Sequence, residues 1–180
     1  MILAGHSLGS QIAYDAMNRL VHLAYSGELA GYAETTSATL GKQLMDVLGG
    51  FITFGSPLDK IAFFLRNQVP PEQYIRRQLM RNFHAFKQRN WDVLEKDYPF
   101  IVDTIFPRLL DELKWRNYFD KHDYVSGSLD YYSPLTNIDM KFDSSTFSFT
   151  HSRYWQHRGM FDDIIHEFLL GANVPVAGKV

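Results

Sequence analysis

The stretch Gly5-His6-Ser7-Leu8-Gly9 predicts a tight turn that joins a strand to a helix. An apolar run at residues 2–4 precedes the turn and can complete a buried strand. Apolar residues recur at helical spacing from Leu8 to about Tyr25, which predicts a helix. We expect both glycines to be required, because close approach of the strand and the helix leaves no room for a Cβ atom on either side of Ser7.

The composition of the 180-residue chain is typical of one globular domain, with 46% hydrophobic and 21% charged residues. The net charge of −2 gives no electrostatic reason to expect nucleic acid or an anionic membrane as a partner. Cysteine is absent, which excludes disulfides and favours a reducing compartment, so that a cytoplasmic location is expected. We expect no transmembrane segment, since no apolar run approaches the roughly 20 residues that span a bilayer.

Further strands and a closing helix are predicted after the first helix. The strands are residues 49–54, 115–119 and 138–142, and residues 147–149 extend or pair with the last of these. Residues 154–170 have the apolar spacing of an amphipathic helix. Because the strands alternate with helices, we predict an α/β fold with a mainly parallel sheet flanked by helices.

Residues 59–112 differ from the rest of the chain, since they combine many aromatic residues with helical periodicity and proline breaks. We predict two to four helices inserted between two core strands, and interpret them as a helical cap over the functional site; ordinary connecting helix is the alternative. The single domain, residues 1–180, then has a core of residues 1–58 and 113–171 and a loose tail at 172–180.

Five stretches resemble, in this order, landmarks of lipase-like and esterase-like α/β-hydrolases. They are Gly5-His6-Ser7-Leu8-Gly9-Ser10, Thr53-Phe54-Gly55-Ser56-Pro57-Leu58, Trp115-Arg116-Asn117-Tyr118, Asp123-Tyr124-Val125-Ser126 and His151-Ser152-Arg153-Tyr154-Trp155. In that family the G-x-S-x-G pattern is the nucleophile elbow. The resemblance implies a serine hydrolase of carboxylic ester, thioester or lipid-like acyl substrates. We expect neither a metal nor a cofactor.

The resemblance also implies a Ser-Asp-His triad. A serine hydroxyl is a weak nucleophile, and it needs a histidine base that a carboxylate orients. The family order of serine, acid and histidine places the nucleophile at Ser7, the acid at Asp123 and the base at His151. The backbone N–H of Leu8, which follows the nucleophile, is expected to bind the oxyanion.

Two of the triad positions have alternatives in the sequence. Asp120 directly follows a predicted strand and competes with Asp123, and Asp130 is a more distant option. His157 competes with His151, although His151 has the expected place between a β-prone stretch and the last helix. The sequence favours Asp123 and His151 but leaves these alternatives open.

The elbow begins only four residues after Met1. In the hydrolases that the chain resembles, several strands precede the elbow, and a loop after an early strand supplies a second oxyanion donor. We therefore expect the C-terminal portion of such a domain, with that donor missing and one sheet edge uncovered. The alternative functions are a catalytically inactive truncated fragment and a non-catalytic binding module with the hydrolase fold.

Overall fold

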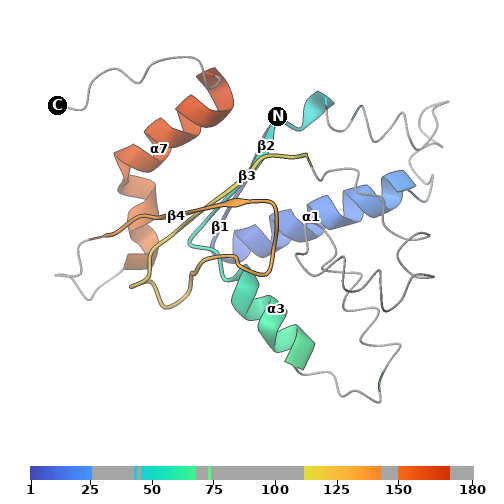
Figure 1. The fold of residues 1–180 in the computed structure, drawn as a ribbon, viewed down its shortest axis with the longest axis horizontal. Helices are drawn as coiled ribbons and strands as arrows, with labels where there is room; N and C mark the ends of the chain where they lie inside the picture. Colours follow the sequence, from blue (N-terminus) through green and yellow to red (C-terminus); the bar gives the residue numbers. More distant parts are fainter. Residues whose placement is uncertain (26–42, 44–45, 68–72, 74–111, 143–149, 171–180) are drawn as a thin grey trace.

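The computed structural model describes residues 1–25, 43, 46–67, 73, 112–142 and 150–170. Strands and helices alternate along the chain (Figure 1). In order they are β1 (Ile2–His6), α1 (Leu8–Tyr25), β2 (Gly50–Phe54), α3 (Leu58–Asn67), β3 (Trp115–Phe119), β4 (Thr136–Asp139), the 3₁₀ helix η2 (Thr150–Gln156), α7 (Arg158–Ile164) and the π-helical segment η3 (Ile165–Leu170).

The four strands form one parallel sheet in the order β1-β2-β3-β4. Among the described strands, β1 pairs with β2 alone. Since all four strands run in the same direction, their carboxyl ends lie at one edge of the sheet, where the chain turns into α1 and α3. This arrangement confirms the predicted α/β class with a parallel sheet flanked by helices.

The sheet is covered on both faces, because side chains of β2 that point to opposite faces join two different buried clusters. Phe51 packs into a cluster beneath α1, whereas Ile52 and Phe54 pack into a cluster with α7 and η2. Successive side chains of a strand point to opposite faces, so β2, buried along its whole length, serves both clusters. Figure 1 shows α1 and α7 on opposite sides of the sheet.

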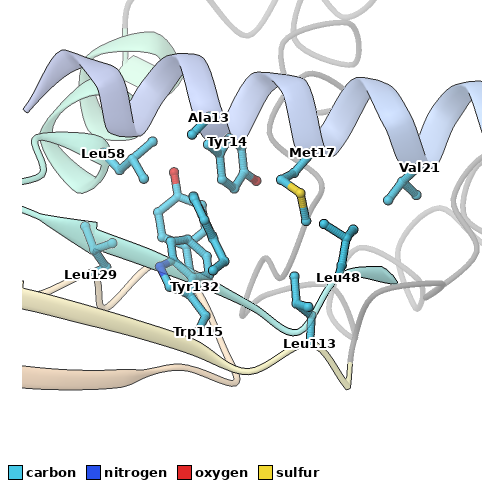
Figure 2. Close-up of a cluster of buried hydrophobic side chains, with 11 residues drawn as sticks. Ala13, Tyr14, Met17, Val21, Leu48, Leu58, Leu113, Trp115, Leu129 and Tyr132 are labelled. Carbon is cyan, nitrogen blue, oxygen red and sulfur yellow. The ribbon is translucent and has the colours of Figure 1, made fainter. Parts of the chain in front are cut away.

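Aromatic rings fill the space between α1 and the sheet (Figure 2). Tyr14 of α1 meets the ring of Tyr132 edge-on at 5.2 Å between centroids, and Tyr132 lies 5.2 Å from Trp115 of β3. All three side chains are almost fully buried. This packing fixes the start of α1, and with it the turn at Ser7, relative to the strand ends.

Two predicted boundaries are shifted in the structure. The strand predicted at 138–142 is β4 at Thr136–Asp139, because the chain turns at Lys141, whose φ is 51°, and the Phe142 N–H then bonds Asp120. The helix predicted from residue 154 begins as α7 at Arg158, since His157 caps it and residues 150–156 form η2.

Other predictions lie partly or wholly outside the described residues. Of the insert at 59–112, the structure describes α3, residue 73 and residue 112, and the remainder of the proposed cap is not among the described residues. The β-prone stretch at 147–149 and the tail at 172–180 also fall outside them. Within the described part of the chain, no helix combines the length and apolarity needed to cross a membrane.

Candidate active site

Ser7 occupies the turn between β1 and α1 in a conformation that is unusual for a residue with a side chain. Its φ is 54°, in the left-handed region, which costs an L-residue about 1–2 kcal/mol. Two backbone hydrogen bonds hold the turn: Ser7 N–H donates to Phe54 O at 3.1 Å, and Ser10 N–H donates to Ser7 O at 2.9 Å. Strain of this kind persists where the surroundings determine the backbone, and it is frequent at functional sites.

The two glycines of the turn have different roles. A Cβ atom on Gly5 would lie 2.6 Å from the Cα of Ser10, so close contact between β1 and α1 requires glycine there. A Cβ atom on Gly9 would meet nothing within 4 Å. The prediction that both glycines are sterically required is therefore wrong for Gly9, because position 9 already lies in α1 and faces open space.

The structure brings the three predicted triad residues together in one hydrogen-bonded line. His151 Nε2 lies 2.7 Å from Ser7 Oγ, and His151 Nδ1 lies 2.8 Å from Asp123 Oδ2. An ionised carboxylate only accepts, so Nδ1–H donates to Asp123 and the unprotonated Nε2 accepts from the serine hydroxyl. In this tautomer the imidazole is ready to take the hydroxyl proton.

Asp123 is buried, but its carboxylate has several donors. Oδ1 accepts from the Val125 N–H at 2.9 Å, and Oδ2 accepts from the Tyr154 hydroxyl at 3.1 Å as well as from His151. Burial raises the pKa of Asp123, but the hydrogen bonds from His151, Val125 and Ser126 outweigh it, and the pKa lies below its ordinary value. The carboxylate is thus held ionised beside the imidazole.

Asp120 and Asp130, the alternative acids, bond to backbone and side-chain groups away from His151. Asp120 is fully buried and accepts from the N–H groups of Phe142, at 2.6 Å, and His122, at 2.8 Å. The Asp130 carboxylate is exposed and accepts from the hydroxyl of Ser128. Asp120 therefore fixes the backbone at the start of the loop between β3 and β4, which we call the acid loop because it carries Asp123. Asp123 itself reaches His151.

The alternative base, His157, has a different partner. Its Nδ1 accepts from the Met160 N–H at 3.1 Å, which makes it the N-cap of α7.

Leu8, the predicted oxyanion donor, is the first residue of α1. Its N–H is therefore one of the first four of the helix, which have no intrahelical acceptor. The oxyanion role of the Leu8 N–H stays a prediction.

Contacts from α3 hold the loop that carries Asp123. The ammonium of Lys60 donates to the carbonyls of Tyr124 and Ser126, on either side of Val125. The carboxylate of Asp59 accepts from two N–H groups farther along the same loop, those of residues 130 and 131. The first turn of α3 therefore holds this loop at two places, around residue 125 and at residues 130 and 131.

Two neighbours of the triad, Gly55 and Tyr154, were not assigned to its surroundings by reasoning from sequence. Gly55 has a φ of 60°, and a Cβ atom there would lie 3.1 Å from His151 Cε1. Tyr154 is fully buried, and its hydroxyl bonds both Asp123 and Ser126. The strand-exit glycine and a tyrosine three residues after the histidine were visible in the sequence, but their approach to the triad depends on the fold.

Comparisons of the chain with protein-family models, with curated proteins and with solved structures found no match. Among the described residues, no group of histidine and acidic side chains is arranged to hold a metal ion. The geometry of the Ser7, His151 and Asp123 side chains is consequently the basis for a functional conclusion.

Proposed function

We propose that the chain is a serine hydrolase of the α/β-hydrolase type, acting on carboxylic ester, thioester or lipid-like acyl substrates. The single observation that carries this proposal is the continuous hydrogen-bonded line from Ser7 Oγ through His151 to the buried Asp123. The order serine, acid, histidine along the chain is that of the α/β-hydrolases. A strained serine at the carboxyl end of a parallel strand, directly before a helix, supports the same assignment.

In the proposed acylation, Ser7 Oγ bonds to the acyl carbon while His151 Nε2 takes the hydroxyl proton. The carbonyl electron pair moves to oxygen, and the N–H of Leu8 donates to the resulting oxyanion. Collapse of this intermediate breaks the bond to the leaving oxygen or sulfur, which receives the proton from His151. Asp123 remains ionised and holds the imidazole in its tautomer.

In deacylation, a water molecule gives a proton to His151 and bonds through its oxygen to the acyl carbon. The second intermediate collapses by breaking the bond to Ser7 Oγ, which takes the proton back. The products are a carboxylic acid and the free enzyme. Each proton is thus transferred through the same Nε2 atom, which lies 2.7 Å from the serine oxygen.

Apolar side chains beside the nucleophile support an acyl substrate. Leu8 directly follows Ser7 and is 65% exposed, and Trp155 is 58% exposed. The ring of Trp155 lies 5.4 Å from that of His6, the residue before the nucleophile. Exposed apolar groups near a reactive hydroxyl would favour contact with an acyl chain over a highly charged substrate.

The proposal is tested by hydrolysis of p-nitrophenyl esters of increasing acyl length by the full chain, with Ser7→Ala as the matched control. We expect turnover by the wild-type protein, a preference for apolar acyl chains and loss of at least 10³-fold in kcat for Ser7→Ala. Equal rates for the folded wild-type and Ser7→Ala proteins would overturn the proposed function.

A further inference from the structure

His6, which precedes Ser7, hydrogen-bonds two residues of η2. Its Nε2 lies 3.1 Å from the backbone oxygen of His151, and its Nδ1 lies 3.3 Å from Nε1 of Trp155. The His6 ring also stacks on the His151 ring, with centroids 4.9 Å apart and planes inclined by 28°. A residue on β1 therefore contacts both the main chain and the side chain of the proposed base.

These two hydrogen bonds require a single tautomer of His6. The indole N–H of Trp155 is only a donor, so Nδ1 of His6 must accept and carries no proton. The ring proton then sits on Nε2, which donates to the carbonyl of His151. Burial lowers the pKa of His6, which keeps the ring in this neutral form.

Gly55 leaves space for the stacked rings of His6 and His151. A Cβ atom on Gly55 would lie 3.1 Å from Cε1 of His151 and 3.2 Å from Cδ2 of His6. The positive φ of Gly55 and the absence of its side chain thus allow the two imidazoles to approach each other. The His6 ring also stacks against the ring of Phe54, with centroids 5.0 Å apart.

We propose that His6 is a positioning residue, which holds His151 in reach of Ser7 through a hydrogen bond to its carbonyl and by stacking on its ring. This inference rests on the proposed hydrolase function, because it assigns His6 to the same site. Asp123 holds the ring of His151, and the hydrogen bond from His6 ties the main chain of η2 at His151 to β1. Trp155 fixes the tautomer in which His6 donates.

A pair of substitutions separates the hydrogen bond from simple packing. His6→Phe keeps an aromatic ring but removes the donor, and His6→Gln supplies an amide N–H near the position of Nε2. We expect His6→Phe to lower kcat for p-nitrophenyl esters about tenfold with little change in KM, and His6→Gln to recover most of the loss. Trp155→Phe, at an exposed position, should lower kcat less, because the donor remains but its tautomer is no longer fixed.

A second readout does not depend on turnover. The proton shared by His151 Nδ1 and Asp123 should give a far-downfield ¹H NMR signal, assigned by its absence in His151→Ala. We expect this signal to broaden or vanish in His6→Phe and to persist in His6→Gln. Equal kcat and an unchanged signal in a folded His6→Phe protein would overturn the inference, as would equal losses in both His6 variants.

The two proposals fail in different ways. If wild-type and Ser7→Ala proteins hydrolyse esters equally, the proposed function fails, and the NMR signal still decides whether His6 positions His151. If Ser7→Ala alone is inactive and both readouts of His6→Phe match wild type, the function stands and the role of His6 fails.

Discussion

His151 Nε2 lies 2.7 Å from Ser7 Oγ, although 144 residues separate the two side chains in the sequence. Ser7 reaches this position at the end of an edge strand of the described sheet, whereas His151 lies in the short helix η2. Neither element forms the contact alone: the turn after β1 aims the serine, and β1 itself, through His6, contacts the carbonyl of His151. The site is therefore a product of tertiary packing at the carboxyl edge of the sheet.

The strained backbone at Ser7 predicts that a residue with a side chain at this position reduces the stability of the fold. Ser7→Gly should relieve the positive φ of 54°, whereas Ser7→Ala should retain it. The extra chain entropy of glycine in the unfolded state offsets part of this gain. Ser7→Gly should therefore be more stable than Ser7→Ala by roughly 0.5–1 kcal/mol in urea unfolding. A Ser7→Ala protein as stable as Ser7→Gly would mean that the turn is not strained.

The two glycines of the turn should respond oppositely to alanine. Gly5→Ala places a methyl group against the backbone of Ser10 and should cost about 1–3 kcal/mol of unfolding free energy. Gly9→Ala fills open space within α1 and should be neutral or stabilising by up to about 1 kcal/mol. Urea denaturation of both variants measures the contrast, and similar losses in the two would contradict it.

Asp120 and Asp123 should have separable roles, although both are buried. Asp123→Asn should lower kcat by about 10⁴-fold, because an amide does not hold His151 in the required tautomer. Asp120→Asn should mainly lower stability, by about 1–3 kcal/mol, because it weakens the bonds to the N–H groups of Phe142 and His122. Ester hydrolysis and thermal unfolding measured on both variants would expose an exchange of these roles.

The two histidines can be separated in the same way. His157→Ala removes the N-cap of α7 and should cost about 1 kcal/mol of stability while leaving kcat near wild type. His151→Ala should abolish turnover, because it removes the proposed base. Loss of turnover in His157→Ala at a temperature where it is folded would make His157 the better candidate for the base.

Acid should destabilise the protein partly through Asp123. Its pKa is lowered in the folded state, so the ionised carboxylate contributes stability that is complete above its unfolded pKa of about 3.8. That contribution should be lost as the pH falls through the lower, folded pKa. Urea unfolding from pH 6 to pH 3 should show the stability of wild type approaching that of Asp123→Asn as the pH falls. If the unfolding free energies of wild type and Asp123→Asn differed by a constant amount over this pH range, the lowered pKa of Asp123 would be contradicted.

Much of the fold was predictable because the apolar pattern is simple. The fully buried β2 is a short run rich in β-prone residues, and α1 was predicted with its observed bounds from its helical spacing. The end of β4 and the start of α7 were not predicted correctly. The end of β4 depends on a tertiary hydrogen bond from the Phe142 N–H to Asp120, and the start of α7 depends on the cap from His157.

The candidate site was predictable only as a set of positions. Ser7 stands out through its flanking glycines, and the resemblance to the hydrolases favoured Asp123 and His151 while Asp120, Asp130 and His157 stayed open. The contacts of His6 with His151, and of Lys60 with the acid loop, link residues 145 and more than 60 positions apart. No local spacing encodes such contacts, because they arise where strands and loops converge at the sheet edge.

The central claim, that Ser7 is a nucleophile activated by His151, is tested most directly by intact-mass analysis after treatment with a fluorophosphonate. The folded chain should gain one covalent adduct, which peptide mapping should place on Ser7, and His151→Ala and Ser7→Ala should gain none. A folded wild-type protein that remains unlabelled, or an adduct that persists in Ser7→Ala, would contradict the assignment.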